Sequence, residues 1–264
     1  MFNFRRLTII FIIIIIGLNF VSLISHSLHY GWFGCHFYFW NISVFVAYSG
    51  ISFALAFLPC SNFHHPVLCK GETTEKVLSL TFDDGPDPKN SPLVLETLRK
   101  HDITATFFCI GKNLEGNEEL IRQMVSEGHL IGNHSLSHSI RFDFFSSGRI
   151  KAELLKTNEI ITNITGKTPN FFRPPFGVVN PLVSSALKGI SLQTVCWNIR
   201  SLDTVIRNPK KISDRIFTRL KPGSIILLHD HSDFSTRYLD NLLLKIKDAG
   251  FRVIPLDQLL NKLS

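Results

Sequence analysis

The sequence predicts an α/β fold, a (β/α) barrel of about seven strands, preceded by an N-terminal transmembrane helix or helical hairpin. Three observations support this prediction. Residues 7–69 contain no Lys, Arg, Asp or Glu, whereas the rest of the chain has an ordinary globular composition. After Val77, apolar runs typical of strands alternate with amphipathic helical stretches. Polar residues follow several of these runs, at the positions where strands of such a barrel present functional side chains.

Residues 1–70 form the predicted membrane anchor and linker, with candidate spans at 7–25 and 41–59. Each span is uncharged and long enough to cross a hydrocarbon core of about 30 Å as a helix. Two alternatives stay open: a single span followed by an interfacial segment, and a cleavable signal peptide over the first span.

The charges that flank these spans predict the topology. Arg5 and Arg6 precede the first span, and Lys70 follows the second. The positive-inside rule then places both ends of a hairpin, and with them the globular domain, on the cytoplasmic face of the inner membrane. One span fewer would place the domain on the extracytoplasmic face.

Composition narrows the classes of partner. The chain has 264 residues, of which 28 are basic and 21 acidic, for a net charge of +7. The basic residues are scattered, which disfavours nucleic acid as a partner and fits contact with anionic membrane lipid. The five cysteines form no CxxC pair, so we expect neither a disulfide framework nor a structural zinc site.

Residues 71–264 form the predicted globular domain. Its expected strands are VLSLTF, ATFFCI, HLIGNHS, FFRPPFG, LQTVCW, SIILLHD and FRVIPL, with helical patterns between them. The polar residues at or just beyond strand ends are Asp83, Asp84, His134, His138, Arg173, Asp203, His229 and Asp230. Because parallel strands of a barrel end on one rim, we expect these side chains to converge there.

Asp84, His134 and His138 form a predicted metal triad. The sequence NHSLSH spaces two imidazoles four residues apart, which lets both reach one ion. Two histidines and one carboxylate leave coordination positions open for water and substrate, as in catalytic zinc sites. The same donors suit other divalent transition ions, so zinc is expected first, with cobalt, nickel or manganese as alternatives.

Two adjacent like charges at Asp83 and Asp84 need an explanation. Neighbouring residues at a strand end point in different directions, so Asp84 can hold the metal while Asp83 faces the reacting water as a general base. A cation and an Arg nearby would keep both carboxylates ionised. Gly85-Pro86 then turns the chain away from the site.

Four stretches carry a resemblance to a known family: TFDDGP at 81–86, HSLSH at 134–138, RPPFG at 173–177 and LLHD at 227–230. In their order and spacing they resemble the polysaccharide deacetylase family, also called the NodB-homology or carbohydrate esterase 4 family. The resemblance covers residues 75–262. It implies a distorted (β/α) barrel and a hydrolase of non-peptide carbon–nitrogen bonds, here in a membrane-anchored branch of the family.

The resemblance also implies catalytic roles. Asp83 is the base that activates metal-bound water, and Arg173 orients it. His229 protonates the leaving amine, and Asp203 tunes His229. Asp84 keeps the metal-binding role already derived for it, together with the two histidines named above.

Substrate-binding residues follow from the same motifs. Pro175, Phe176 and Gly177 belong to the third motif, where a backbone N–H near Phe176 is implied to stabilise the oxyanion. Leu227 lines the pocket for the small acyl group.

The fourth motif of the family departs from its usual pattern of two aspartates and a Trp. WNIRSLDT places Arg200 at the first aspartate and Thr204 at the Trp, so Asp203 alone remains. Because that Trp usually forms a wall of the sugar groove, we expect the substrate to differ from a long polymer.

The predicted function is removal of an acetyl or formyl group from an N-acylated saccharide, either a glycan or a lipid-linked sugar at the membrane. Two alternatives stay open: hydrolysis of a non-sugar C–N bond, and a catalytically silent carbohydrate-binding membrane protein. The presence of both Asp83 and His229 argues against the silent protein, because loss of catalytic residues is typical of pseudoenzymes.

Overall fold

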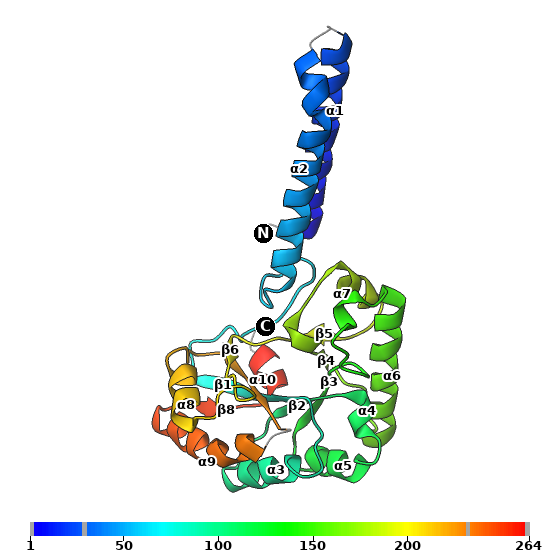
Figure 1. The fold of residues 1–264 in the computed structure, drawn as a ribbon. Helices are drawn as coiled ribbons and strands as arrows, with labels where there is room; N and C mark the ends of the chain where they lie inside the picture. Colours follow the sequence, from blue (N-terminus) through cyan, green and yellow to red (C-terminus); the bar gives the residue numbers. More distant parts are fainter. Residues whose placement is uncertain (1–2, 28–30, 231–232, 262–264) are drawn as a thin grey trace.

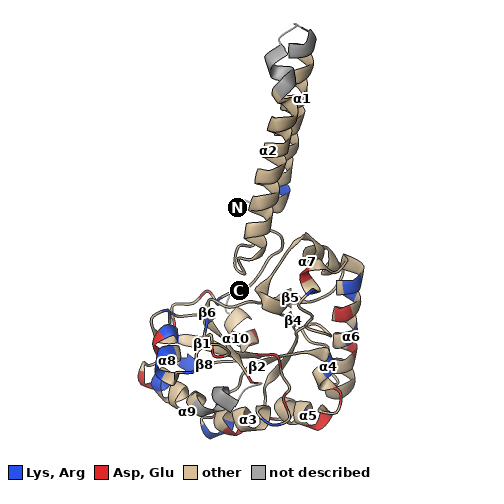
Figure 2. Cartoon of the chain, in the orientation of Figure 1, with Lys and Arg blue, Asp and Glu red and all other residues tan. Residues whose placement is uncertain are grey.

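The computed structural model describes residues 3–27, 31–230 and 233–261 and shows a helical hairpin that projects from an α/β domain (Figure 1). The hairpin consists of α1 (Phe4–Ser27) and α2 (Gly31–Ala56). Residues 28–30, which connect the two helices, lie outside the described part of the chain. Charged residues cover the domain, but the hairpin carries almost none (Figure 2).

Both hairpin helices are long and apolar enough to cross a membrane, over Phe4–Ile24 and His36–Ala56. Large apolar side chains such as Ile13 and Leu23 are more than half exposed, as expected of a surface that meets lipid. The predicted second span, 41–59, was wrong at its end, because α2 stops at Ala56. Pro59 explains the difference, since its ring disfavours helix in the preceding residue.

The domain is built on one sheet of eight strands in the order β5-β4-β3-β2-β1-β7-β6, with β8 paired to β1. Every pairing between these strands is parallel, which confirms the predicted α/β class. The strands are β1 (Val77–Asp83), β2 (Thr106–Cys109), β3 (Leu130–Asn133), β4 (Phe171–Phe172), β5 (Gln193–Thr194), β6 (Ile199–Arg200), β7 (Ser224–His229) and β8 (Arg252–Val253). The eighth strand arises because the LQTVCW region ends as β5 and the chain pairs again as β6.

Helices cover the outside of the curled sheet (Figure 1). The longer helices are α3 (Ser91–Lys100), α5 (Glu118–Ser126), α6 (Ser147–Thr165), α8 (Pro209–Phe217) and α9 (Asp233–Asp248); the shorter elements are α4 (Gly111–Leu114), η1 (Phe142–Phe144), η2 (Pro175–Gly177), α7 (Pro181–Ala186) and α10 (Leu256–Asn261). Asn208 begins α8 by accepting a hydrogen bond from the Lys211 N–H, a standard N-cap.

The alternating side-chain directions along β1 determine which of its residues face the candidate site. Leu78, Leu80 and Phe82 are fully buried in the main hydrophobic core, which also contains residues of α3, α8 and α9. Burial of each such side chain stabilises the fold by about 1.5–3 kcal/mol. Because successive side chains of a strand alternate in direction, Thr81 and Asp83 point to the other face, the interior of the curled sheet.

A short connection in the chain brings the two end strands of the sheet close together. β5 and β6 end the strand order on opposite sides, yet residues 195–198 alone connect them. Five residue steps span at most about 18 Å, so the sheet must curl back on itself. The fold is therefore an open, distorted barrel, as the sequence predicted.

The linker after the hairpin crosses the opening of this barrel. The Leu68 N–H donates to the Thr194 carbonyl at 2.9 Å, and the Leu68 carbonyl accepts from the Cys196 N–H at 2.9 Å. Further on, the Gly71 N–H donates to the Gly223 carbonyl at 2.8 Å. The division of the chain near residue 70 stays a prediction, but these contacts place the linker against β5 at one end of the sheet and against the start of β7 near the other end.

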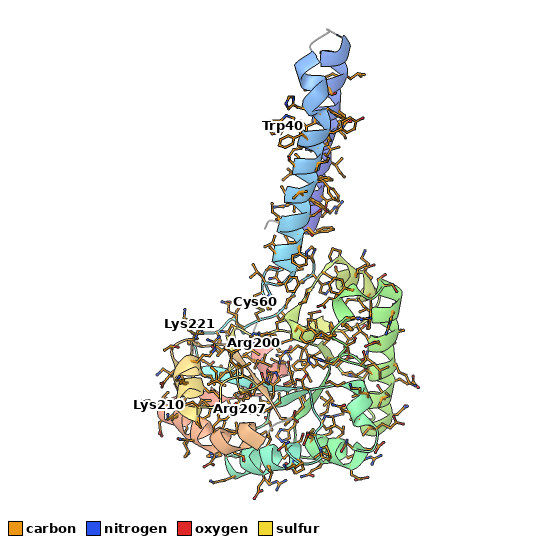
Figure 3. The ribbon with its side chains drawn as sticks, viewed as in Figure 1. Trp40, Cys60, Arg200, Arg207, Lys210 and Lys221 are labelled. Carbon is orange, nitrogen blue, oxygen red and sulfur yellow. A yellow bond between two sulfur atoms is a disulfide. The ribbon has the colours of Figure 1, made fainter. Side chains whose placement is uncertain are left out.

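A disulfide joins Cys60 to Cys69 in this linker, which lies where hairpin and domain meet (Figure 3). The expectation of no disulfide was therefore wrong. The odd cysteine count and the missing CxxC gave no signal, because the pairing depends on how the linker folds to bring the two Cα atoms within 5.9 Å of each other. Cys109 and Cys196 are free and buried.

Removal of the linker is expected to destabilise the domain. A fragment that starts at residue 71 lacks the buried Val67 and the Leu68 hydrogen bonds to β5 and residue 196. From side-chain burial and two backbone hydrogen bonds, we expect its free energy of unfolding to be roughly 3–5 kcal/mol lower than that of a fragment starting at residue 57. Urea unfolding of both fragments measures the difference. Equal midpoints and slopes would show that the linker is not part of the folded unit.

Candidate active site

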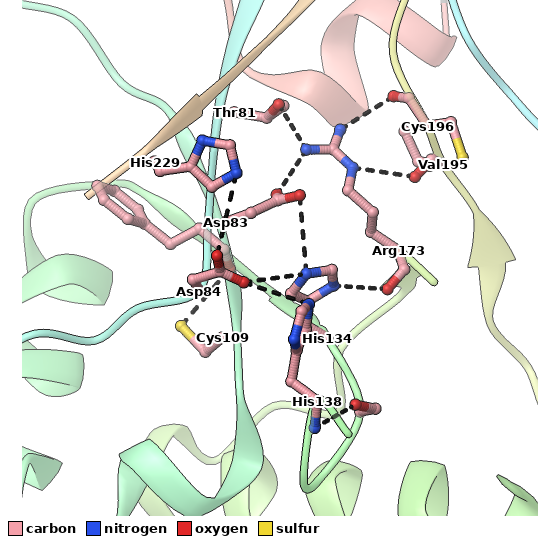
Figure 4. Close-up of polar contacts among 12 residues, drawn as sticks. Thr81, Asp83, Asp84, Cys109, His134, His138, Arg173, Val195, Cys196 and His229 are labelled. Carbon is pink, nitrogen blue, oxygen red and sulfur yellow. Dashed lines mark hydrogen bonds and ion pairs between the residues drawn. The ribbon is translucent and has the colours of Figure 1, made fainter. Parts of the chain in front are cut away.

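The carboxyl end of β1 separates the two adjacent aspartates, as the sequence predicted. Asp83 is the last strand residue and is 4% exposed, facing the barrel interior. Asp84 has left the strand and takes a left-handed φ of 75°. This conformation costs a non-glycine residue about 1–3 kcal/mol, and it turns the Asp84 carboxylate toward His134 and His138 (Figure 4).

Arg173 holds Asp83 in place. Arg173 follows β4, is fully buried, and its Nη1 donates to Asp83 Oδ1 at 2.7 Å and to Thr81 Oγ1 at 2.7 Å. Its Nε and Nη2 donate to the carbonyls of Val195 at 3.1 Å and Cys196 at 2.9 Å (Figure 4). The guanidinium is fixed by four acceptors, so Asp83 has a defined position and a compensating charge.

The three predicted metal ligands converge. Asp84 Oδ1 lies 3.5 Å from His134 Nε2 and 3.4 Å from His138 Nε2 (Figure 4). Donor atoms bound tetrahedrally to one zinc ion are separated by about 3.3 Å, so the spacing fits a shared ion. Candidate ligand atoms of all three residues lie within 4.8 Å of one another.

The protonation of these ligands also suits a cation. His134 Nδ1 lies 2.7 Å from the Arg173 carbonyl, where it acts as donor and leaves the Nε2 lone pair for a metal. Burial, together with the charge of His134, lowers the pKa of His138 to about 4, so His138 is neutral at pH 7. Burial would raise the pKa of Asp84, but His134, His138 and His229 outweigh it and lower the pKa well below its usual value.

The loop that carries the histidines is held by buried polar groups that the sequence analysis did not identify. Asn133 Oδ1 accepts from the Ser135 N–H at 2.8 Å, and Glu153 of α6 accepts from the Ser137 hydroxyl at 2.8 Å. Ser135 and His138 both have positive φ, at 64° and 44°. The sequence did contain a sign of this contact, because Glu153 occupies a position of the amphipathic α6 pattern that faces the protein interior.

His229 and Asp203, predicted as a general acid and its partner, lie in hydrogen-bond contact. Asp203 Oδ1 lies 2.7 Å from His229 Nδ1, and its Oδ2 accepts from the His229 N–H at 2.9 Å. Burial would lower the pKa of His229, but the hydrogen bond and charge of Asp203, together with the charges of Asp83 and Asp84, outweigh burial, so the pKa is raised. His229 Nε2 lies 4.0 Å from Asp84 Oδ2, so the His229 side chain is next to the predicted metal triad.

Tyr238 extends this pair and was missed from the sequence. Its hydroxyl donates to Asp203 Oδ2 at 2.9 Å, and its side chain is 3% exposed. Asp203 therefore accepts from Tyr238 as well as from His229 and Ser201, which fixes its carboxylate plane. Tyr238 lies 35 residues beyond Asp203 within α9, and no local pattern marks it.

The third-motif loop borders the histidine site. Phe176 has φ 56° and is 48% exposed, and its ring packs edge-on against His138 with centroids 4.9 Å apart. Pro175 and Gly177 are buried beside it. Gly177 has φ 73°, and a Cβ there would lie 2.7 Å from the Trp197 ring, so both conformation and space require glycine.

The altered fourth motif lies on β6. Arg200 is exposed, with its guanidinium 6.0 Å from the centre of the Trp197 ring, and it does not take part in the His229–Asp203 contact. Thr204 follows Asp203 and is half-buried. Leu227 pairs with Arg200 across β6 and β7 and is 2% exposed, so its side chain is enclosed two residues before His229.

Three comparisons place the chain among known proteins. A sequence model described as Polysaccharide deacetylase matches residues 70–195. The chain is 37% identical to the peptidoglycan-N-acetylmuramic acid deacetylase PdaA of Bacillus subtilis, over 72% of this chain and 73% of the relative. It is 32% identical to the peptidoglycan-N-acetylglucosamine deacetylase PgdA of Listeria monocytogenes over 77% of this chain, and this match spans 42% of the relative's length.

A solved structure shares the fold. A CE4 family pseudoenzyme from Bacillus anthracis superimposes with a TM-score of 0.68 at 28% identity, over 73% of this chain and 68% of that one. Both the sequence motifs and the curled parallel sheet thus agree with the resemblance inferred from residues 81–86, 134–138, 173–177 and 227–230. The chain belongs to the polysaccharide deacetylase family, whose named relatives are hydrolases of non-peptide carbon–nitrogen bonds.

Proposed function

We propose that this protein is a metal-dependent N-deacetylase that removes the acetyl group from an N-acetylated sugar of a glycan. One observation carries the proposal: a buried base, Asp83, and an acid, His229, flank the Asp84–His134–His138 group within one small space. Relatives named as peptidoglycan deacetylases support an N-acetylated glycan as the substrate class.

The donors fit a divalent ion, and zinc is the proposed one. Two imidazoles and one carboxylate match the ligands of catalytic zinc sites, and cobalt, nickel or manganese could use the same set. When bound, such an ion polarises the amide carbonyl and lowers the pKa of water. Asp84, His134 and His138 would hold it, with His134 oriented through the Arg173 carbonyl.

The chain's own residues supply the proton transfers. Asp83 takes a proton from the attacking water as the water oxygen bonds to the carbonyl carbon of the acetyl group. The backbone of the Phe176 loop is proposed to donate to the developing oxyanion. His229 gives a proton to the sugar nitrogen as the C–N bond breaks, which releases acetate and a free amine. Arg173 and Asp203 keep the base and the acid in position.

Substitution of Asp203 by Asn is expected to move the pH dependence. A general acid must be protonated, so activity is present below the pKa of His229 and is lost as pH rises through it. Burial lowers that pKa, and Asp203 contributes most of the opposing rise; without the charge of Asp203, only the weaker effects of Asp83 and Asp84 oppose burial, so the pKa falls. The basic limb of kcat/KM should therefore shift to lower pH, with a loss of about 10²–10⁴-fold above the new limb. A pH–rate profile measures this, and an unshifted basic limb would contradict the role of His229.

The silent-protein alternative has a named precedent, because the similar Bacillus anthracis structure is described as a pseudoenzyme. This chain keeps a base, an acid and all three candidate ligands, with the arrangement described above. These retained groups favour an active enzyme over a carbohydrate-binding protein.

Acetate release tests the function. The full chain, stripped with a chelator and reloaded with zinc, would be assayed on N-acetylated glycan fragments, lipid-linked N-acetyl sugars and a cyclic imide. We expect zinc-dependent release from at least one sugar and none from the imide. Release from lipid-linked sugars alone would support the lipid-linked substrate suggested by Arg200 and Thr204. Imide hydrolysis without sugar turnover would overturn the proposal.

We further propose that the hairpin anchors the protein in the cytoplasmic membrane with the domain on its extracytoplasmic face. The Cys60–Cys69 disulfide supports this side, because disulfides persist in oxidising compartments and are rare in the cytosol. It outweighs the cytoplasmic placement predicted from Arg5 and Arg6, whose flanking-charge rule is a statistical tendency. Protease added to intact spheroplasts should digest the domain. Protection until lysis would place the domain inside.

A further inference from the structure

A groove of about 410 Å³ lies between the inner end of the hairpin and the domain. Its volume is within the range of small-molecule sites, roughly 300–1,000 Å³. The hairpin side of the groove includes Phe4 and Phe53, followed by Phe57 just after α2, and the domain side includes Asp143, Phe144 and Leu182. The groove is therefore shared between the proposed membrane spans and the domain.

Backbone contacts hold the two walls of the groove together. The Val179 N–H donates to the Ala56 carbonyl at 3.1 Å, next to Val178 and Asn180 of the lining. The Phe4 N–H donates to the Phe63 carbonyl at 2.8 Å, which fixes the start of α1 to the linker. The groove is thus a consequence of how hairpin and domain are joined.

Several apolar side chains that line the groove are exposed at the surface of the protein. Phe144 is 78% exposed, Phe57 50% and Leu182 40%. They lie beside the last turns of the span His36–Ala56, where a membrane would end and its headgroups begin. Exposed aromatic and aliphatic side chains at this level favour contact with lipid over water.

Asp143 is the one charged residue among the described residues that line the groove. Its Oδ1 is buried and has no hydrogen-bond partner in the described part of the chain. Burial raises the pKa of Asp143 to about 6, still below neutral pH, so the carboxylate is mainly ionised. An ionised acceptor in apolar surroundings favours a ligand that brings a donor with positive charge.

We propose that the groove binds one phospholipid of the surrounding bilayer, with a hydrocarbon chain against Phe53, Phe144 and Leu182 and an ammonium headgroup at Asp143. The proposal rests on the membrane location proposed above. Phosphatidylethanolamine has a headgroup that donates hydrogen bonds, whereas the trimethylated headgroup of phosphatidylcholine cannot. The lipid would also contact Val178, one residue beyond Gly177, and so support the loop that borders the histidines.

Native mass spectrometry of the full chain tests the site. The chain would be released from nanodiscs that contain equal amounts of phosphatidylethanolamine and phosphatidylcholine. We expect wild type to retain one phospholipid, enriched in phosphatidylethanolamine. Leu182→Glu and Phe144→Ser, both at exposed positions, should each lower retention about tenfold. Leu93→Glu is the matched control, because Leu93 is 45% exposed on α3, at the end of the domain away from the hairpin (Figure 1).

Asp143→Asn distinguishes the contribution of the lipid headgroup to binding from that of the hydrocarbon chain. This variant should retain lipid but lose the preference for phosphatidylethanolamine. Equal retention by wild type and Leu182→Glu would overturn the groove, and an unchanged preference in Asp143→Asn would overturn the headgroup contact. Extraction of wild type from membranes by alkaline carbonate would overturn the membrane location and the groove with it. Acetate release from soluble N-acetylated fragments, measured on the same samples, reports separately on the deacetylase.

Discussion

Replacement of Asp83 by Asn is expected to lower kcat by at least about 10³-fold while zinc content stays at the wild-type level. Asn has nearly the same shape but cannot accept a proton at neutral pH, so the water would lose its base. Asp84, His134 and His138 are unchanged, so the ion should still bind. Kinetics on an N-acetylated fragment and metal analysis of the purified protein measure both effects.

The same variant should also be less stable. Arg173 is fully buried, and Asp83 is its one carboxylate partner among the described residues. Removal of one member of a buried ion pair costs about 3–5 kcal/mol, although three further acceptors of Arg173 reduce this figure. Asp248→Asn, an exposed position on α9, is the control for the loss of a carboxylate. Full turnover in Asp83→Asn would exclude Asp83 as the base.

His134→Ala is expected to lower metal affinity and activity together. His134 is 2% exposed and lies between the Arg173 carbonyl and the proposed ion, so the substitution removes a ligand whose orientation is fixed. Loss of partners that merely orient a ligand already costs about 10–100-fold in affinity, and loss of the ligand should cost at least that. Zinc titration followed by kcat at saturating zinc separates weaker binding from slower chemistry.

His129 provides a matched control for this experiment. It is equally buried, and its Nδ1 accepts from the Ala105 N–H at 3.0 Å, but it lies outside the metal triad. His129→Ala should reduce stability without any change in zinc affinity. If His134→Ala kept wild-type zinc affinity while His129→Ala lost it, the assignment of the ligands would be wrong.

Local motifs explain why much of the site could be predicted. Asp83 and Asp84 are adjacent, and His134 and His138 share one loop, so each pair is visible as a short pattern. Parallel strands then bring these patterns to one rim, a rule that needs no knowledge of side-chain contacts. The convergence of Arg173 on Asp83, 90 residues apart, agrees with that rule.

Contacts that depend on exact packing could not be predicted. Thr81 shares Arg173 Nη1 with Asp83, and Tyr238 reaches Asp203 from α9, but both look like ordinary core residues in the sequence. The additional strand β6, which lies beyond the expected strand LQTVCW, depends on how far the sheet curls. The Cys60–Cys69 pair likewise depends on where the linker crosses the sheet.

The linker that crosses the barrel opening has a mechanical consequence. A flexible tether would let an enzyme search a wide shell of space around its attachment point. Here the hydrogen bonds of Leu68 and the Cys60–Cys69 bond restrict the movement of the hairpin relative to the rim that carries the candidate site. In a membrane, the reacting centre would stay at one height and one tilt. The enzyme would then select acetyl groups by their distance from the bilayer as well as by their chemistry.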